Sequence, residues 1–242
     1  MKKVEDEFEA ITGIATFKDK VIIDVGCGTG ELVRVLTMQG AQATGIDTPE
    51  MVSKAKENSP IRDEQYVPGA GENLPFRDSY ADIVIYFASL HHVPMPRMNQ
   101  AIKEVHRVLK AGGIVIFVEP VGKKGSYFEV IRIVEDEREI QKHAYEAIKH
   151  AKAIGFKNVE EKMIYIERSF EDYVKLLNTF IDDEKKRNEY MVQSREVTEK
   201  ICREAKVDIK DYRFKSICRV NVLEKGVRTA HPPTQDATRS AD

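Results

Sequence analysis

Short apolar runs and amphipathic stretches alternate along the first half of the chain. The runs are rich in β-branched residues, as strands are, whereas the stretches between them space their apolar residues three or four apart, as helices do. Strands are predicted at 20–25, 41–47, 66–69, 80–87 and 114–119. Helices are predicted at 4–17, 31–39, 49–56 and 101–109. This alternation indicates an α/β fold with a doubly wound, parallel sheet between two helical layers.

The pattern changes after Pro120. A long helix, a strand and a last strand are predicted there, at 128–153, 159–166 and 212–223. The stretch 169–206 is highly charged with one apolar face, and we predict that it is a helical lid inserted into a single domain covering 1–224. Residues 225–242, rich in Pro, Thr, Asp and Ala, are predicted to form a disordered tail.

Composition narrows the class of protein and its partners. With 242 residues, 42% of them hydrophobic and 32% charged, the chain suits one domain with an ordinary core. The net charge of −2 argues against a nucleic-acid partner, and no apolar run approaches the ~18 residues of a membrane span, so no membrane insertion is expected. Three cysteines, an odd count, and an N-terminus without the apolar core of a signal peptide indicate a cytoplasmic protein. The oligomeric state stays open.

The first strand runs into a pattern that suits a polar ligand. Asp24 is followed by Gly26, Gly28 and Gly30 and then by a helix, so backbone N–H groups and a helix N-terminus meet at one point. A pyrophosphate would gain nothing from the carboxylate before the turn, whereas a ligand with a positive amine would. Cys27, inside the turn, is interpreted as a small buried residue rather than a nucleophile. The turn is therefore interpreted as a site for a zwitterionic or cationic nucleoside.

Polar residues also follow the neighbouring strands. Asp24, Asp47, Glu72 and the residues after Phe87 all fall where a predicted strand ends. Ligands of open α/β sheets bind beyond the carboxyl ends of the strands, at the point where the strand order reverses. We therefore expect these groups to converge on one crevice.

The order of the motifs resembles that of the class I S-adenosylmethionine-dependent methyltransferases, closest to the small-molecule enzymes of the ubiquinone and menaquinone type. The matching segments are 24–30, 45–47, 69–76, 82–84, 90–93 and 107–113. Each is weak alone, but six in this order are specific, and they lie within residues 15–120. The resemblance implies a Rossmann-like sheet of seven strands, mostly parallel with the last one antiparallel. It also implies in-line methyl transfer from S-adenosyl-L-methionine to a small-molecule acceptor.

The resemblance further implies a set of cofactor contacts, namely Asp24, Gly26, Cys27, Gly28, Gly30, Asp47, Thr48, Met51, Gly71, Glu72 and Phe87. The glycine turn would lie against the methionine part of the cofactor, with Asp24 and the carbonyl of Phe87 near its amine. Asp47 would accept hydrogen bonds from both ribose hydroxyls, an arrangement open to a carboxylate.

The same resemblance places the adenine. Thr48 and Met51 would line its pocket, and Gly71 and Glu72 would lie beside its edge. The family often has an aspartate where this chain has Ala70, and that aspartate commonly meets the adenine amine. Either Glu72 or the backbone alone would take over that contact here.

Catalytic candidates follow the strand that ends at Phe87. His91 and His92 are the first choice, with packing beside the cofactor as the alternative interpretation of either side chain. Glu119 and Tyr127 are further candidates, and a base is needed only if the acceptor is protonated at the working pH. No third ligand is spaced for zinc beside the two histidines, so no metal site is predicted.

Two other functions stay open at this point. A non-catalytic module that binds S-adenosylmethionine would explain Ala70 and the lack of an obvious base. A nicotinamide-dependent oxidoreductase is less consistent with the chain, because Gly26-x-Gly28-x-Gly30 does not have the G-x-G-x-x-G spacing of dinucleotide sites. The sequence does not identify the acceptor or the atom that is methylated.

Overall fold

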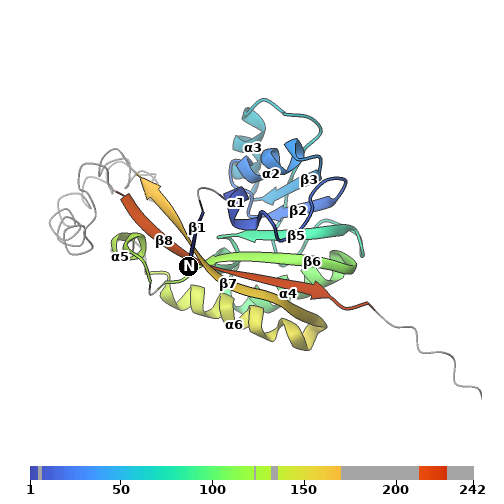
Figure 1. The fold of residues 1–242 in the computed structure, drawn as a ribbon. Helices are drawn as coiled ribbons and strands as arrows, with labels where there is room; N and C mark the ends of the chain where they lie inside the picture. The colour runs from blue at the N-terminus through green and yellow to red at the C-terminus, as the bar shows by residue number, and fades with distance from the viewer. Residues whose placement is uncertain (5–6, 123, 132–135, 170–212, 228–242) are drawn as a thin grey trace, which may run out of the picture.

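The computed structural model describes residues 1–4, 7–122, 124–131, 136–169 and 213–227. Eight strands form one mixed sheet in the order β1-β7-β8-β6-β5-β2-β3-β4 (Figure 1). Their bounds are Lys2–Val4 for β1, Val21–Val25 for β2, Gln42–Asp47 for β3, Gln65–Pro68 for β4, Ala81–Phe87 for β5, Leu109–Pro120 for β6, Phe156–Ser169 for β7 and Arg213–Lys225 for β8. Strand β8 is antiparallel to both β6 and β7, and the other strand pairs are parallel. The predicted Rossmann-like α/β fold with an antiparallel last strand is confirmed.

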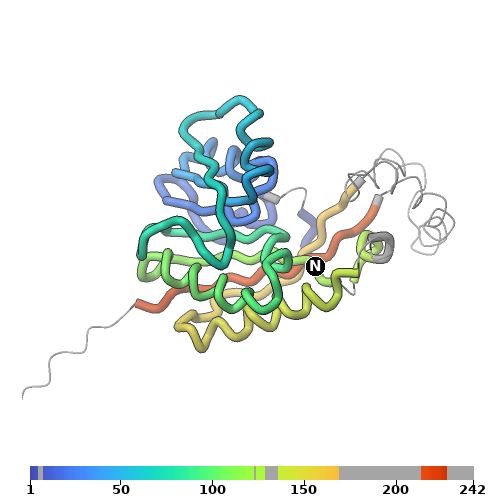
Figure 2. The backbone as a smooth tube through the Cα atoms, turned by 180° about the vertical axis from the view of Figure 1, so that it is seen from behind, coloured from blue at the N-terminus to red at the C-terminus, as the bar shows by residue number. Residues whose placement is uncertain are grey.

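Helices cover both faces of this sheet. Their bounds are Glu7–Ile11 for α1, Glu31–Met38 for α2, Pro49–Glu57 for α3, Met98–Val108 for α4, Ser126–Ile131 for α5 and Arg138–Ile154 for α6, with short 3₁₀ turns η1 at Leu90–His92 and η2 at Met95–Arg97. The first three helices pack with Ile22 and Ile85 in one core, whereas α4 and α6 pack with Ile23 and Val84 in the other. Successive strand residues thus point to opposite faces. Figure 2 shows α4 and α6 side by side over the second face.

The sheet has one strand more than the seven expected. Strand β1 pairs in parallel with β7, where Lys2 lies opposite Ile164 and Val4 opposite Ile166. The sequence pattern predicted only a helical lead-in over 4–17, of which α1 occupies a short part. A three-residue edge strand in which only Val4 is buried carries too little alternation to be recognised in the sequence.

One helix and one strand boundary were predicted wrongly. The helix expected over 128–153 is interrupted, because Asp136 and Glu137 are not helical and α6 begins only at Arg138. The backbone N–H of Arg138 donates to the Asp136 carboxylate at 3.2 Å, a local bond that competes with helix continuation. The strand expected from residue 114 begins at Leu109 instead and passes through Gly112.

Other predicted elements lie close to their expected bounds or outside the described residues. Helix α6 ends at Gly155, whose φ of +113° suits glycine. The predicted helical lid at 169–206 falls almost wholly outside the described residues, as does the predicted tail beyond residue 227. Among the helices that the structure describes, none is long and apolar enough to cross a membrane.

The strand order reverses between β2 and β5. From β2 the chain adds β3 and β4 on one side, and from β5 it adds β6 on the other. The carboxyl ends of β2 and β5 are therefore the place where this fold leaves room for a ligand.

Candidate functional site

The turn after β2 is built from the backbone. The N–H groups of Gly26 and Cys27 donate to the carbonyl of Ile46 at 2.7 and 3.1 Å, which ties the turn to β3. Gly26 has a φ of +76°, and a Cβ on it would lie 2.4 Å from the Cβ of Ser89. Only glycine satisfies both demands. Asp24, one residue before β2 ends, is 2% exposed.

Asp47, the last residue of β3, lies against this turn. Its Oδ2 accepts a hydrogen bond from the Gly28 N–H at 2.8 Å, and its Oδ1 accepts one from the Thr48 N–H at 2.7 Å. Two backbone donors therefore fix the carboxylate between the glycine turn and the start of α3. Each carboxylate oxygen keeps acceptor capacity for a ligand hydroxyl. The structure thus brings together three residues that the sequence placed at one cofactor site.

The first turn of α3 also lies beside the glycine turn. Thr48 is the N-cap, and its Oγ1 accepts from the Met51 N–H at 3.4 Å. A Cβ added to Gly28 would lie 4.0 Å from the Met51 methyl group. Thr48 and Met51, expected to line one pocket, therefore lie beside the turn, with Met51 facing it.

Cys27 is a packing residue, as the sequence suggested. Its sulfur occupies the space beside Gly45, where a Cβ would lie 2.6 Å from it. Burial, reinforced by the charges of Asp24 and Asp47, raises the pKa of the Cys27 thiol to about 12. The thiol is therefore neutral at physiological pH and does not act as a nucleophile.

Tyr66 supports the turn and was read from the sequence only as part of a strand. A Cβ on Gly30 would lie 2.4 Å from the Tyr66 ring, so ring and glycine are in close contact. The Tyr66 hydroxyl donates to the Gly30 carbonyl at 3.3 Å, and Arg34 donates to that hydroxyl at 3.4 Å. No local pattern connects residues 36 positions apart, which is why sequence reasoning missed this support.

The loop after β4 holds the two residues expected at the adenine edge. Gly71 packs against Tyr86, whose hydroxyl donates to the Gly71 carbonyl at 3.4 Å. Glu72 has a side chain only 12% exposed and forms an ion pair with Arg97 at 2.9 Å. Ala70 is exposed and forms a backbone bridge with Asn73. The acid of this loop is therefore already paired.

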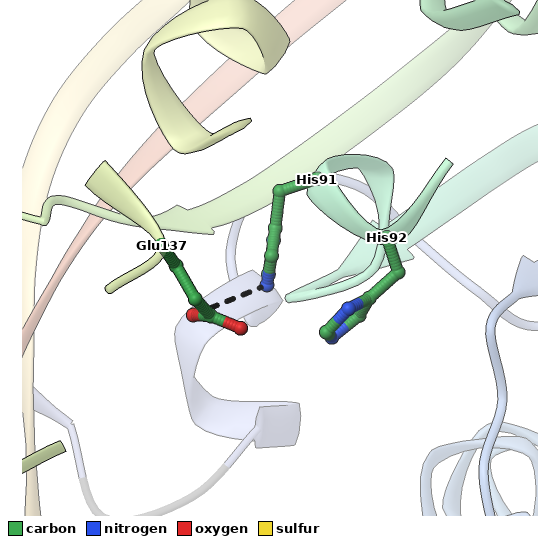
Figure 3. A group of neighbouring side chains, drawn as sticks. All are labelled: His91, His92 and Glu137. Carbon is green, nitrogen blue, oxygen red and sulfur yellow. Dashed lines mark ion pairs between the residues drawn. The ribbon is translucent and has the colours of Figure 1, made fainter. Parts of the chain in front are cut away.

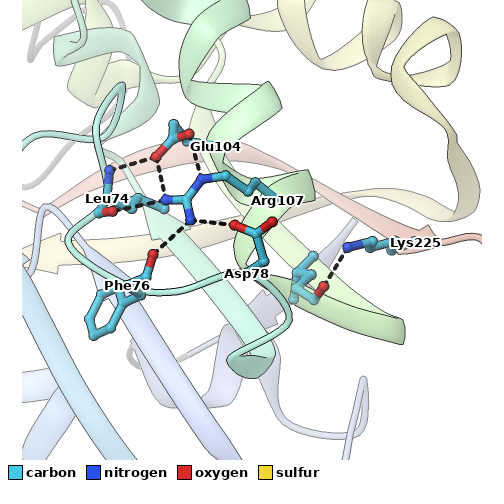
Figure 4. Close-up of polar contacts among 7 residues, drawn as sticks. Leu74, Phe76, Asp78, Glu104, Arg107 and Lys225 are labelled. Atoms are coloured by element: carbon cyan, nitrogen blue, oxygen red, sulfur yellow. Dashed lines mark hydrogen bonds and ion pairs between the residues drawn. The ribbon is translucent and has the colours of Figure 1, made fainter.

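Arg107 of α4 fixes the following part of this loop, as Figure 4 shows. Its guanidinium donates to the carbonyls of Leu74 at 3.0 Å and Phe76 at 2.7 Å, and to the carboxylates of Asp78 at 2.9 Å and Glu104 at 2.7 Å. Glu104 also accepts from the Leu74 N–H at 3.0 Å. Hydrogen bonding from Arg107 lowers the pKa of the Glu104 carboxyl below its usual value. The only sequence signal for this network was the three-residue spacing of Glu104 and Arg107 on one helix.

The end of β5 faces the turn from the other side of the reversal point. Phe87 is 8% exposed, and Ala88 has a φ of +49°, a conformation that strains a residue other than glycine. Ser89 Oγ donates to the carbonyl of Val25 at 2.5 Å. This bond joins the carboxyl ends of β2 and β5 directly.

His91 and Glu119, both catalytic candidates, form a buried pair. Glu119 Oε2 lies 2.5 Å from His91 Nδ1, and its Oε1 accepts from the N–H groups of Ser89 at 3.2 Å and Leu90 at 2.8 Å. The side chain of His92 is exposed, and its ring centroid lies 4.1 Å from that of His91. The two carboxylate oxygens thus hold both the start of η1 and the His91 ring.

Two further groups are linked to this pair: Glu137 faces His91, and its charge acts on Tyr127. Burial raises the pKa of Tyr127 to about 12, so its hydroxyl is protonated at neutral pH. Glu137, which the sequence did not single out, lies 3.9 Å from His91 Nε2 through its Oε2. The structure therefore supplies a third donor beside the two histidines, although their sequence spacing indicated none.

Comparison with known proteins finds similarity to methyltransferases. Residues 23–117 match the family described as a methyltransferase domain. A 2-methyl-6-phytyl-1,4-hydroquinone methyltransferase of Arabidopsis thaliana is 34% identical over 149 residues, covering 60% of this chain and 43% of that protein. A demethylmenaquinone methyltransferase of Chlorobaculum tepidum is 29% identical over 119 residues, covering 48% of each chain. The matches thus span less than half of these two relatives.

The fold has a close counterpart among solved structures. A candidate methyltransferase from Bacillus halodurans superposes with a TM-score of 0.65 at 21% identity, over 91% of this chain and 99% of that one. The superposition covers 91% of the chain and therefore extends beyond residues 23–117. At this identity it speaks for the architecture alone.

Proposed function

We propose that this protein transfers a methyl group from S-adenosylmethionine to a small-molecule acceptor, because residues 23–117 match the family described as a methyltransferase domain and the relatives are methyltransferases by name. One observation carries the proposal. The Asp47 carboxylate at the end of β3 is fixed by the Gly28 N–H at 2.8 Å, directly beside the glycine turn at the reversal point. A nucleoside with an aminoacyl arm fits this combination of an acid and an open backbone turn.

We assign the cofactor contacts to the glycine turn and to residues that follow the neighbouring strands, namely Asp24, Gly26, Cys27, Gly28, Gly30, Asp47, Thr48, Met51, Gly71, Glu72 and Phe87. Asp47 would bind the ribose hydroxyls with the acceptor capacity left by its two backbone donors. Asp24 would face the amine, and Gly71 would meet the adenine through its backbone.

When bound, S-adenosylmethionine supplies an electrophilic methyl carbon. The chain contributes alignment, because the Ser89–Val25 hydrogen bond fixes the cofactor side and the acceptor side of the crevice against each other. We propose that His91 and His92, two and three residues after Ser89, contact the acceptor. The Glu119 carboxylate orients the His91 ring for that contact.

The names of the relatives support a class of acceptor. Two of them act, by name, on a hydroquinone and on demethylmenaquinone. We propose an acceptor of this kind, a small aromatic molecule that carries hydroxyl groups. We further propose that the protein works in the cytoplasm, which the odd number of cysteines in the sequence supports, and without a nucleic-acid partner, which agrees with its net charge of −2.

Calorimetric titration with S-adenosylmethionine, S-adenosylhomocysteine and NADH tests the cofactor. We expect both sulfur nucleosides to bind with 1:1 stoichiometry and NADH not to bind. Tight binding of NADH alone would show an oxidoreductase instead. Incubation with S-adenosylmethionine and a panel of reduced quinones then tests turnover by release of S-adenosylhomocysteine. Cofactor binding without release for any acceptor would favour a binding module of the same fold.

A further inference from the structure

We propose that His91, His92 and Glu137 bind a divalent transition-metal ion on the acceptor side of the crevice. Each residue offers one ligand atom, and these atoms all lie within 4.8 Å of one another. Figure 3 shows the three side chains converging from two elements, the histidines from η1 and the glutamate from the turn before α6. The proposal rests on the proposed function only for what the ion does, not for its binding.

The fold brings the three donors together from distant parts of the chain. Turn η1 follows β5 and presents two adjacent histidines, while the interruption before α6 leaves Glu137 at the helix entrance, where α6 contacts η1. The Nε2 of His91 lies 3.9 Å from Oε2 of Glu137. Two ligands bound to one ion at about 2.0–2.2 Å lie roughly 3–4 Å apart. His91 Nε2 and Glu137 Oε2 already lie at this spacing, and all three ligand atoms lie within 4.8 Å of one another.

His91 has the outer contact that metal-binding histidines have. Glu119 accepts from two backbone N–H groups, so it acts as an acceptor toward Nδ1 of His91 as well, at 2.5 Å. The Nδ1 atom then carries the proton, and the lone pair is left on Nε2, the atom that faces Glu137. A carboxylate bound to the far ring nitrogen is the usual device that fixes the tautomer of a ligating histidine.

Glu137 is held in the same way. The side chain of Gln141, one helical turn later and itself 8% exposed, donates to Oε2 of Glu137 at 2.9 Å. This bond leaves the other oxygen and further lone pairs for a cation. Ligating carboxylates are themselves usually hydrogen-bonded. Both the nitrogen and the carboxylate donors are thus preoriented by buried partners.

The chemistry of the donors selects the class of ion. Imidazole nitrogens favour zinc, iron, cobalt or nickel, whereas magnesium and calcium prefer oxygen ligands alone. Two histidines and one carboxylate leave at least one position open, as in catalytic rather than structural sites. The carboxylates of Glu119 and Glu137 also place two negative charges around His91, which suits a divalent cation.

The open position gives the ion a role in the proposed function. His91 and His92 follow the end of β5, where the acceptor would lie. A hydroxyl oxygen of the acceptor that binds the ion loses its proton to solvent more readily, because the cation stabilises the oxyanion. The acceptor class is thereby narrowed to molecules with a hydroxyl group at or beside the methylated atom.

Metal titration of the full-length, tag-free protein tests the site. After removal of metals by a chelator, we expect Co²⁺ to bind with 1:1 stoichiometry and visible d–d absorption, and Zn²⁺ to displace it. His92→Ala and Glu137→Gln should each weaken Zn²⁺ binding by more than about tenfold, since each removes one of three ligands. The matched controls His150→Ala and Glu139→Gln change exposed residues of α6 and should leave the affinity unchanged.

Glu119→Gln tests the orienting contact. An amide N–H facing Nδ1 moves the His91 proton to Nε2, so Zn²⁺ should bind about tenfold more weakly and the ¹⁵N chemical shifts of the His91 ring should report the other tautomer. Thermal unfolding of each variant confirms that it is folded. The site would be overturned if the wild type did not bind the metal ion with 1:1 stoichiometry. It would also be overturned if His92→Ala and Glu137→Gln bound Zn²⁺ as tightly as the wild type does. Titration of the same samples with S-adenosylmethionine separates that outcome from a failure of the proposed function.

Discussion

The two sides of the point where the strand order reverses, at the carboxyl ends of β2 and β5, are built on different principles. On the glycine side, the backbone makes the site, because N–H groups of Gly26, Cys27 and Gly28 donate to Ile46 and Asp47. On the histidine side, buried side chains make it, as the contacts of Glu119 with η1 and His91 show. The first side tolerates few changes of backbone conformation, whereas the second can change its chemistry through single side chains.

This difference separates what is shared within a family from what distinguishes its members. We propose that the glycine turn, whose shape is fixed by backbone hydrogen bonds, binds the cofactor, the ligand that members of such a family would share. The side chains of η1 and of Glu137, just before α6, would then bind the acceptor or ion particular to this protein. We therefore expect changes on the glycine side to affect cofactor affinity, and changes on the histidine side to affect acceptor and metal only.

Gly26→Ala should give the largest effect. Its φ of +76° costs an alanine about 1–2 kcal/mol, and the added Cβ would lie 2.4 Å from Ser89, a clash that requires the ends of β2 and β5 to separate. We expect S-adenosylmethionine to bind more than about 100-fold more weakly, with a loss of about 3–4 kcal/mol in the free energy of unfolding. Calorimetry and urea denaturation measure the two.

Gly13→Ala is the matched control for this change. Gly13 has a φ of +82° but nothing within 4 Å of an added Cβ, so it reports conformational strain without a clash. We expect about 1 kcal/mol of destabilisation and unchanged cofactor affinity. Equal effects of the two substitutions would show that the close approach of the turn to Ser89 does not matter.

Asp47→Asn should have the next largest effect. The amide cannot accept on both sides, so either Gly28 or Thr48 loses its partner, and the charge that would bind the ribose hydroxyls is lost. We expect S-adenosylmethionine to bind about 10–30-fold more weakly, or roughly 1.5–2 kcal/mol, which is typical of a hydrogen bond to a charged group. Calorimetry measures the shift, and Asp63→Asn, in an exposed loop, is the control. Unchanged affinity would remove Asp47 from the cofactor site.

The contrast between the sides also explains which parts of the site could be predicted from the sequence. The glycine turn, Asp47 and the caps of α3 are local patterns, and the longest link between them spans 19 positions across two adjacent strands. The pair on the other side, His91 with Glu119, joins residues 28 positions apart, and the contact of Leu74 with Glu104 that holds the loop after β4 spans 30 positions. Glu137 lay inside a predicted helix, and only the interruption before α6 gives it a place beside His91.

The elements of the fold likewise divide into those that the sequence predicts and those that it does not. Strands buried on both faces and their helices repeat with a period that the sequence displays, so β2 to β6 were located within a few residues apart from the early start of β6. Strand β1 depends on pairing with β7 at residues more than 150 positions away, and no local signal encodes it. Long-range pairing decides such elements, not propensity.

Glu119→Gln should give a smaller effect, and one confined to the histidine side. The amide still accepts from Ser89 and Leu90, but its N–H meets Nδ1 of His91. We expect a loss of about 1–2 kcal/mol in the free energy of unfolding, the usual result of one poorly satisfied buried group, and cofactor affinity within about threefold of wild type. Denaturation and calorimetry on one preparation measure both. A loss of cofactor affinity as large as that of Asp47→Asn would remove the distinction between the two sides.

The smallest effect should come from pH, through the loop that closes the glycine side. Hydrogen bonding from Arg107 lowers the pKa of Glu104 below its usual value of 4.5, so the pair stabilises the folded state fully above that value. This stabilisation is lost as the pH falls through the lowered pKa of the folded state, because Glu104 becomes protonated. Urea denaturation of wild type and Glu104→Gln from about pH 6 to about pH 3 should give profiles that converge at low pH, from a difference of about 1 kcal/mol for a partly screened ion pair. Parallel profiles would show that the contacts of Arg107 with Leu74 and Phe76 hold the loop without Glu104.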